Sequence, residues 1–400
     1  MNLAIDTNCI LPGRVGGIEN YTLGLIEALK LPQSPASSLL LLTRAENHAL
    51  FSRYADARAK LEIIERPTHN GQPIGSWADL MKSNPAAGKK ALDAFAAKKA
   101  KLLRRWNIDL IHFPGNTINP LELDLPAVLN LHDLQHRHFP QYFTPAELQN
   151  REKWWVASAR RADALIAASN YVRDDLVQQL GIKRSRIFVT PDAFQSAYLK
   201  APSQAELDAL RIRLSLSHTF FVYPAAVWPH KNHQRLIEAF LKANIPGAEL
   251  LLTGGGQEES NLRALIDSHG AHNRVRLLGR VSTDDLIALY HLATALIFPS
   301  EHEAWSIPMM EAMACGCPIA CSNVTSLPQE LGDAGLLFGP HDIDAMADAM
   351  LRLARDRQLR MVLADRGRRR VADFSPANFL RGISAAYEFA LQSRSLAKAA

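Results

Sequence analysis

Glu303 and Glu311 flank the start of a short predicted helix, and this spacing suits a ligand that carries both phosphate and hydroxyl groups. The apolar run before them predicts the end of a buried strand. Ser306 is a favourable N-cap, and Pro308 fits the first helical turn, where its missing N–H has no cost. Gly316 is a frequent type of C-terminal stop. The sequence therefore predicts a strand, a tight loop and a helix that begins near Ser306.

The chemistry of this segment follows from the helix start. The backbone N–H groups of Ser306 and Ile307 are expected to point out of the helix at the carboxyl end of a strand, where parallel α/β sheets bind phosphate. A carboxylate beside a phosphate is unfavourable, so Glu303 and Glu311 need other partners, such as the vicinal hydroxyls of a ribose or a hexose. The spacing suggests a phosphate flanked by sugars. An ordinary helix start with two solvated glutamates fits the spacing alone equally well.

Lys231 is a second candidate for contact with phosphate. It lies between a predicted strand over 220–223 and a predicted helix over 234–242. A lysine at that position is a point charge suited to a diphosphate. Exposed lysines are common, so Lys231 becomes a strong candidate only because Glu303 and Glu311 occur in the same half of the chain.

The residues around these positions resemble the signatures of the retaining family-four glycosyltransferases, which have the GT-B fold. The segment from Glu303 to Glu311 is similar to the family's Glu-x7-Glu motif. The segment from Trp228 to Phe240 is similar to its Pro-Arg-Lys-Asn-x-x-x-Leu-Ile-x-Ala-Phe motif. Where the family often has an arginine six residues before the lysine, this chain has Ala225. The resemblance covers nearly the whole C-terminal half and is looser in the N-terminal half.

The resemblance implies roles for individual residues. It implies that His132, Lys231 and Glu303 are catalytic, with His132 orienting the donor hexose and Lys231 stabilising the charge on the leaving β-phosphate. The residues that it implies for donor binding are Gly16, Gly17, Asp133, Arg280, Val281, Ser306, Ile307 and Glu311. No metal ligand and no cofactor are expected, since the nucleotide sugar is itself the substrate.

The implied activity is a nucleotide-sugar-dependent, retaining hexosyltransferase of bacterial surface polysaccharide or lipopolysaccharide synthesis. The Trp-Pro-His-Lys-Asn-His sequence at 228–233 looks like the bacterial mannosyltransferase branch, so GDP-mannose is the expected donor and a glycan or a lipid-linked sugar the expected acceptor. Two alternatives stay open: a non-catalytic GT-B subunit that binds sugar nucleotides, and a GT-B sugar-nucleotide epimerase. A nicotinamide oxidoreductase is disfavoured because no Gly-x-Gly-x-x-Gly follows the first predicted strand.

The length of 400 residues and the regular alternation of predicted strands and helices indicate an α/β protein of two domains. With the resemblance, the expected fold class is GT-B: two facing Rossmann-like domains with parallel sheets and a cleft between them. The expected divisions are an acceptor-side domain over 1–197, a nucleotide-sugar domain over 198–374, and a C-terminal helix over 375–392 that crosses back to the first domain.

Composition and the cysteine pattern predict a globular protein of the reducing cytoplasm. Hydrophobic residues make up 48% and charged residues 21%, as in ordinary globular proteins, and the four cysteines form no disulfide framework. The first residues predict a strand rather than a signal peptide. A net charge of +5 suits an anionic ligand or an anionic membrane, and no nucleic-acid partner is expected. A basic helix over 86–105 could lie on the inner face of a membrane, or could pack on the sheet with its lysines solvated.

Overall fold

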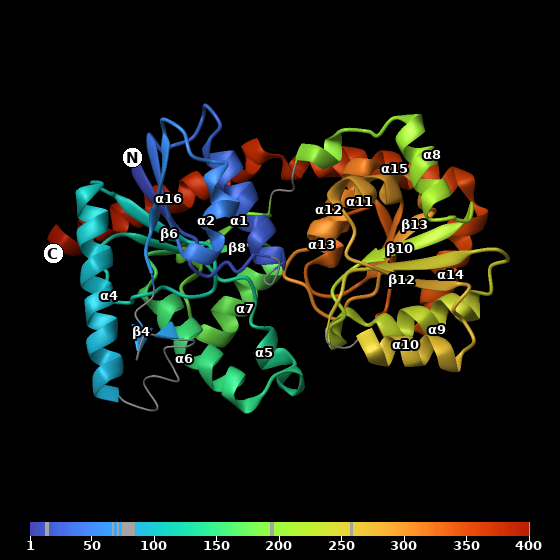
Figure 1. Cartoon of the computed structure of the whole chain (residues 1–400), viewed down its shortest axis with the longest axis horizontal. Coiled ribbons are helices and arrows are strands. Elements are labelled where there is room, and N and C mark those ends of the chain that lie inside the picture. The colour runs from blue at the N-terminus through green and yellow to red at the C-terminus, as the bar shows by residue number, and fades with distance from the viewer. Residues whose placement is uncertain are drawn as a thin grey trace. The chain divides into compact units, whose positions relative to one another are not determined.

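The computed structural model describes residues 1–12, 16–65, 68–69, 72–73, 85–192, 196–256 and 259–399. The chain forms two compact units: unit 1 contains Met1–Ala193 and Pro376–Ala400, and unit 2 contains Phe194–Ser375. The expected divisions fell after residues 197 and 374. Each unit is built on one parallel sheet with helices packed against it (Figure 1).

Unit 1 has a seven-stranded sheet in the order β3-β2-β1-β6-β7-β8-β9, in which every neighbouring pair is parallel. Its strands are β1 (Asn2–Asp6), β2 (Ser38–Thr43), β3 (Ala59–Ile63), β6 (Leu110–Phe113), β7 (Ala127–Asn130), β8 (Ala164–Ala167) and β9 (Ile187–Val189). A separate antiparallel pair is formed by β4 (Thr68–His69) and β5 (Gln72–Pro73). The sequence predicted most of these strands but missed β3, whose half-polar residues resemble a loop.

The helices of unit 1 follow its strands. They are α1 (Gly16–Leu29), α2 (Ala45–Ser52), α4 (Pro85–Arg105), α5 (Gln135–His138), α6 (Pro145–Arg161), α7 (Asn170–Leu180) and α16 (Pro376–Ala399), with 3-10 turns η1 (Pro140–Tyr142) and η2 (Arg184–Arg186). Leu3 and Ile5 of β1 share one apolar cluster with Ile26 of α1 and Tyr387 of α16. The last helix of the chain therefore completes the core of unit 1.

The C-terminal helix is longer than predicted. The sequence predicted a helix over 375–392, but α16 continues to Ala399. Arg394 of the tail donates a hydrogen bond of 2.7 Å to Asp124, and its guanidinium lies 4.0 Å from Asp163. Two carboxylates of unit 1 thus hold the part of α16 that extends beyond the predicted end of the helix.

Unit 2 has a six-stranded parallel sheet in the order β12-β11-β10-β13-β14-β15. Its strands are β10 (Phe220–Pro224), β11 (Glu249–Thr253), β12 (Val275–Gly279), β13 (Ala295–Phe298), β14 (Ile319–Ser322) and β15 (Gly335–Phe338). Its helices are α8 (Gln204–Arg213), α9 (His233–Ala243), α10 (Glu259–Ser268), α11 (Thr283–Leu292), α12 (Ile307–Cys315), α13 (Leu327–Leu331), α14 (Ile343–Arg355) and α15 (Arg357–Val371), with 3-10 turns η3 (Ser196–Leu199), η4 (Pro229–Lys231) and η5 (Ala372–Phe374).

One predicted helix of unit 2 is two helices. The sequence from Ile343 to Leu363 is typical of a single helix, but α14 ends at Arg355 and α15 begins after Asp356. The Asp356 side chain accepts a hydrogen bond of 2.8 Å from the N–H of Leu359, which caps α15. A side chain that caps a helix start ends the preceding helix as well, because its own backbone leaves the helical region.

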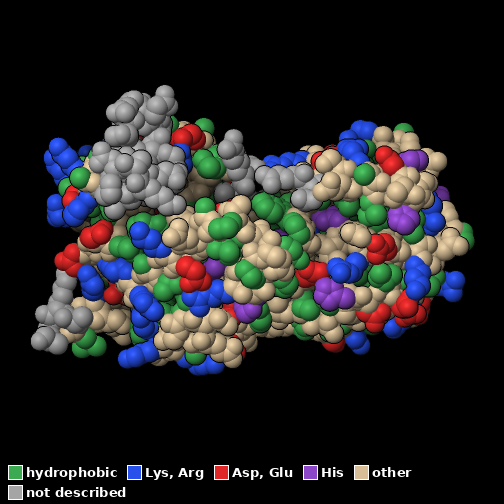
Figure 2. Space-filling view, turned by 90° about the horizontal axis from the view of Figure 1, so that it is seen from below, with side chains coloured by type: hydrophobic (Ala, Val, Ile, Leu, Met, Phe, Trp, Pro, Cys, Tyr) green, Lys and Arg blue, Asp and Glu red, His purple; other side chains and the backbone are tan. Residues whose placement is uncertain are grey.

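Two surface properties bear on the expected partners. Among the described helices, none combines the length and the apolar content that a membrane crossing requires. On the face shown in Figure 2, lysine and arginine side chains are spread over the surface and alternate with aspartate and glutamate. The net positive charge is therefore not gathered in one patch on that face.

Candidate active site

The start of α12 has the geometry that the sequence predicted. Ser306 is the N-cap, and its hydroxyl accepts a hydrogen bond of 3.3 Å from the N–H of Met309. Pro308 lies in the first turn, and Gly316 ends the helix in the left-handed conformation at φ 70°. Because β13 ends at Phe298, the helix N-terminus lies just beyond the carboxyl end of this strand.

One backbone donor of this helix start is already used. The N–H of Ser306 donates a hydrogen bond of 2.8 Å to the carboxylate of Glu330, which is fully buried in α13. The prediction that Ser306 offers a free N–H to phosphate was therefore wrong, because a carboxylate already occupies the positive end of the helix. For the N–H of Ile307, the described residues provide no acceptor. Sequence reasoning missed Glu330, since no pattern links it to Ser306.

The structure brings Lys231 and Glu303 together. Their strands, β10 and β13, are neighbours in the sheet, so the loops after them meet. Lys231 Nζ lies 2.5 Å from Glu303 Oε1, and the two side chains are 19% and 10% exposed. The Tyr223 hydroxyl donates to the carbonyl of Lys231 over 2.9 Å, and the N–H of Glu303 donates to the Thr325 hydroxyl over 3.1 Å. Both backbones are thus fixed, while the ion pair keeps access to solvent.

Histidines surround the lysine without adding positive charge. Burial lowers the pKa of His230 to about 2, with Lys231 and nearby histidines contributing, and burial also lowers the pKa of His233 to about 4. Both imidazoles are therefore neutral at pH 7. Since Ala225 stands where the family often has an arginine, the positive charge beside Glu303 comes from Lys231.

Glu311 has a different environment from Glu303. Tyr290 donates a hydrogen bond of 3.2 Å to Glu311 Oε2, and the Tyr198 hydroxyl also bonds to this carboxylate. Burial raises the pKa of Glu311 to about 7. The two glutamates of the predicted motif therefore have separate partners. Hydroxyl groups hold Glu311, and a ribose would offer groups of the same kind.

The loops after β10 and β11 run against each other because Gly254 has no side chain. A Cβ at this position would lie 2.4 Å from the carbonyl oxygen of Ala225, and the backbone has φ +114°. The N–H of Gly254 donates a hydrogen bond of 2.7 Å to the carbonyl of Gly279, the last residue of β12. Arg280 and Val281 follow directly, so they lie at the same edge of the sheet as Lys231.

In unit 1, His132 and Asp133 follow β7 at its carboxyl end, as predicted. The Nε2–H of His132 donates to the Pro114 carbonyl over 2.8 Å, and its backbone N–H donates to Asn116 over 2.9 Å. Burial lowers the pKa of His132, so the ring is neutral and Nδ1 is its acceptor. Asp133 accepts a hydrogen bond of 3.0 Å from the N–H of Gln135.

Gly16 and Gly17 begin α1, and the residues just before them, 13–15, lie outside the described part of the chain. A Cβ built on Gly17 would meet no atom within 4 Å. Space beside the helix start is therefore open. Gly16, Gly17, His132 and Asp133 belong to unit 1, and the other predicted site residues belong to unit 2.

One lysine of the basic helix α4 is buried, although the sequence predicted it to be solvated. Lys99 was predicted on a solvated basic face, but it is fully buried, pairs with Asp6 and donates to the carbonyl of Asn119 over 2.6 Å. Lys99 lies four residues after Phe95 and four before Leu103, which are both buried. Helical spacing could therefore have placed it on the inner face.

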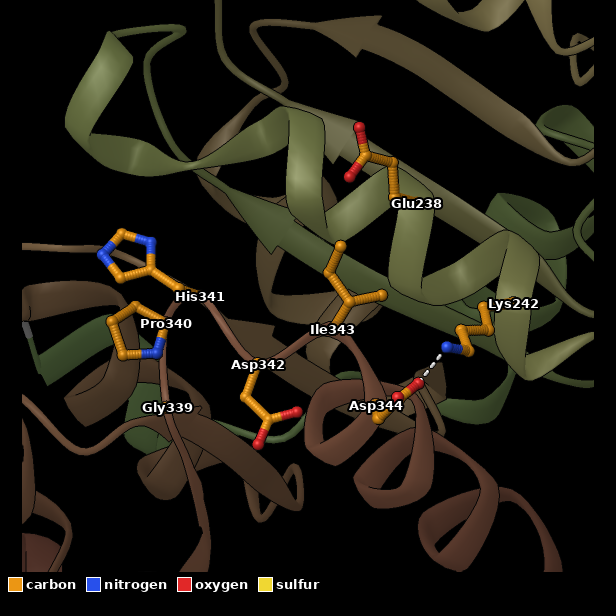
Figure 3. Close-up of a pocket in the computed structure, with 8 residues that line it drawn as sticks. All are labelled: Glu238, Lys242, Gly339, Pro340, His341, Asp342, Ile343 and Asp344. Atoms are coloured by element: carbon orange, nitrogen blue, oxygen red, sulfur yellow. Dashed lines mark ion pairs between the residues drawn. The ribbon is translucent and has the colours of Figure 1, made fainter.

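A surface hollow of about 860 Å³ lies between α9 and the turn before α14 (Figure 3). Asp342 and Asp344 line it with the Asp-x-Asp spacing of a metal-binding pair, which sequence analysis overlooked. Asp342 caps α14 by accepting from the N–H of Ala345 over 2.9 Å, and Asp344 pairs with Lys242. Both carboxylates thus have structural roles, and in the described ranges no group of three potential ligands converges on a metal position.

Comparison with known proteins identifies the family. Residues 211–370 match the family described as glycosyl transferases group 1, and residues 49–194 match glycosyltransferase family 4. O-antigen chain mannosyltransferase B of Escherichia coli is 30% identical over 288 residues, covering 70% of this chain and 74% of that protein. The serotype-specific mannosyltransferase WbdA of Escherichia coli is 31% identical over 231 residues, covering 56% of this chain but only 28% of WbdA.

A solved structure shows the same fold. Anabaena HepE in complex with UDP-glucose matches with a TM-score of 0.74 at 20% identity, covering 97% of this chain and 99% of HepE. The fold of this chain, two Rossmann-like units that each have a parallel sheet, agrees with the matched sequence families. The chain therefore belongs to the family-four, group 1 glycosyltransferases of the GT-B fold.

Proposed function

We propose that this glycosyltransferase moves a hexose from a nucleotide sugar to a glycan or lipid-linked acceptor with retention of anomeric configuration. The observation that carries the proposal is the Lys231–Glu303 pair at the carboxyl ends of β10 and β13. A partly exposed lysine at this edge can exchange its carboxylate for a diphosphate. Glu303 is then free to accept hydrogen bonds from the hydroxyls of the transferred hexose.

The main catalytic task is to stabilise the negative charge that develops on the leaving β-phosphate. Lys231 supplies a full charge, and the N–H of Ile307 at the start of α12 supplies a backbone donor. Glu311 binds the ribose hydroxyls in place of the tyrosine hydroxyls that now hold it. His132 orients the hexose through its neutral ring. No metal is required, because Lys231 and the helix start balance the diphosphate.

GDP-mannose is the proposed donor. The matched Escherichia coli proteins are named as mannosyltransferases, one of them of the O-antigen chain. The His230-Lys231-Asn232 sequence resembles the same branch of the family. HepE, by contrast, was solved with UDP-glucose, so a UDP-sugar is the competing donor.

A donor screen tests the proposal. The purified chain is incubated with GDP-mannose, UDP-glucose and ADP-glucose, and the release of nucleoside diphosphate is measured with and without mannooligosaccharide acceptors. We expect turnover with GDP-mannose and an α-linked product by NMR. Turnover with a UDP-sugar alone would leave a glycosyltransferase with another donor. Nucleotide binding with no turnover indicates a binding subunit, and an epimerised donor indicates an epimerase.

We also propose that the enzyme works at the inner, anionic face of a membrane, where a lipid-linked acceptor is held. Lys90, Lys98, Lys101 and Arg104 of α4 are exposed, whereas Lys99 is not available. Each exposed basic side chain near an anionic surface contributes about 1 kcal/mol. Flotation with anionic liposomes is expected at low salt and not at high salt. Lack of binding at low salt would contradict this part alone.

A further inference from the structure

Arg151 of α6 lies over two aromatic rings in unit 1. Its guanidinium carbon is 4.2 Å from the ring centroid of Phe143 and 4.6 Å from that of Trp155. Cation–π contact with two rings restricts the side chain to one orientation. Arg151 is therefore held in position before any ligand arrives.

Among the described residues, no acceptor takes a hydrogen bond from the Arg151 guanidinium. In the part of the chain that the structure describes, its guanidinium makes neither an ion pair nor a hydrogen bond. Arg137, on the neighbouring α5, binds both oxygens of Glu152 at 2.7 and 2.6 Å. Arg151 thus differs from Arg137: it is fixed by the two rings and has no acceptor among the described residues. Such a group can donate to the oxygen atoms of a ligand.

The aromatic cluster consists of Phe143 and Trp155, which contact Arg151, and of Phe139 and Tyr142, which come just before Phe143 in the chain. Phe139 and Tyr142 stack with parallel planes and centroids 5.5 Å apart. Trp155 packs edge-on against His136 with centroids 5.2 Å apart. Phe139 and Phe143 flank η1, Tyr142 is its last residue, and Trp155 lies in the second half of α6. All four residues come after β7 and the His132–Asp133 pair in the chain.

The charge around Arg151 argues against an anionic ligand. The carboxylates of Asp133 and Glu147 are close enough to favour the charged guanidinium, and they would repel a phosphate. A pyranose has no charge to repel. Its apolar C–H face packs on aromatic rings, and its hydroxyl oxygens accept hydrogen bonds from guanidinium N–H groups.

We propose that Arg151 and the aromatic cluster form a subsite for a neutral sugar residue of the acceptor glycan. This inference rests on the proposed function, because it gives unit 1 the acceptor of that same reaction. Arg151 is a specificity residue here: it contacts the acceptor away from the bond that is made, and it leaves the nucleotide chemistry of Lys231 unchanged.

The test compares Arg151→Gln and Trp155→Leu with Arg160→Gln, which changes an exposed arginine further along the same helix. Binding of α-linked mannotriose and of inorganic phosphate is followed by ligand-observed NMR. Nucleoside diphosphate binding is followed by calorimetry. Both site variants are expected to lose mannotriose affinity at least about tenfold. Arg160→Gln should bind as the wild type does, and all variants should keep nucleotide binding and donor hydrolysis.

Each other result has a defined meaning. Equal mannotriose affinity in Arg151→Gln and Arg160→Gln, or no mannotriose binding by the wild type, overturns the subsite. A selective loss of phosphate binding also overturns it, since the ligand is then an anion. If Arg151→Gln does not fold, Arg151→Lys replaces it. This variant keeps a positive charge against the rings but lacks the forked donors of the guanidinium, so its mannotriose affinity must also be lower than that of the wild type. Absence of donor turnover with intact mannotriose binding would refute the proposed function and leave this subsite standing.

Discussion

Each unit has a lysine–carboxylate pair at the carboxyl end of its sheet, and the two pairs differ in their access to water. In unit 1, Lys99 and Asp6 are 0% and 6% exposed. In unit 2, Lys231 and Glu303 are 19% and 10% exposed. Asp6 also accepts two hydrogen bonds of 2.9 Å from Asn8. We call Lys99–Asp6 the closed pair, because water barely reaches it and hydrogen bonds within the protein already satisfy both groups. We call Lys231–Glu303 the open pair.

The difference separates a structural pair from a pair that can change partners. An ion pair that water cannot reach is costly to break, because each charge would stay buried alone. An ion pair at a solvent-accessible edge can exchange one partner for a charged ligand. The same two residue types at the same edge of a sheet therefore have different uses, and burial decides which one applies.

Removing the lysine of the closed pair is expected to have the largest effect on stability. Lys99→Met leaves the Asp6 carboxylate buried without its partner, and we expect unit 1 to lose about 3–5 kcal/mol of unfolding free energy. Lys231→Met should destabilise unit 2 less, because Glu303 keeps access to water. Hydrogen exchange of β1 and β10 amides in each variant measures the two units separately. Equal losses would show that the difference in burial does not separate the pairs.

Removing the lysine of the open pair is expected to have the largest effect on binding. Lys231→Ala should abolish transfer and weaken nucleoside diphosphate binding by about 1.5–3 kcal/mol, the value of a charge-assisted hydrogen bond. Calorimetry measures the affinity. Lys242→Ala, which removes an exposed lysine beside Asp344, is the matched control and should bind normally. Wild-type affinity in Lys231→Ala would rule out its role at the diphosphate.

The environment of Glu311 predicts a smaller, pH-dependent effect. Its folded pKa of about 7 is raised by burial, so its stabilising contribution is complete below the unfolded pKa and is lost as pH rises through 7. Ribose hydroxyls bind the ionised form better, so nucleotide affinity should increase with pH through 7, by about 1 kcal/mol.

Glu311→Gln is the control for this prediction, because it keeps the shape of the side chain and cannot ionise. We expect its nucleotide affinity to be weaker and independent of pH between 6 and 8. A 2′-deoxyribose nucleotide should show the same flat profile with the unmutated protein. If the ribose and deoxyribose forms bind equally well, Glu311 does not contact the ribose.

No change is expected when divalent metals are removed. In the proposed reaction, Lys231 and the start of α12 balance the diphosphate charge, so EDTA should leave the transfer rate unchanged. The rate is measured with GDP-mannose before and after dialysis against EDTA. Activity that EDTA removes and that magnesium or manganese restores would show that the open pair needs a metal to bind the donor.

Much of unit 2 could be predicted from the sequence, because its main features are set by residues that are close together in the chain. The N-cap at Ser306 and the stop at Gly316 each depend on a few consecutive residues, and both were confirmed. The motifs around Lys231 and Glu303 could also be placed after neighbouring strands. The contact of Ser306 with Glu330 could not, since 24 residues separate them and neither pattern requires the other.

Unit 1 was less predictable, because its polar core is assembled from distant segments. Lys99 meets Asp6 across 93 residues, and the sequence showed only a lysine within a basic helix. The Arg151 contacts depend on how α6 packs on the residues after β7. Helical spacing gives the face of each residue, but it does not identify the partner on another element.

The position of α16 sets the order in which the chain can fold. His112 of β6 shares a hydrogen bond of 2.7 Å with the Tyr387 hydroxyl, and 275 residues separate the two. During synthesis, domains generally fold from the N-terminus onward. Here unit 2 is complete as soon as Ser375 leaves the ribosome, while unit 1 lacks part of its core until α16 has also been made. Pulse proteolysis of stalled nascent chains should find unit 2 protected first, and loss of the last helix should expose the first half of the protein.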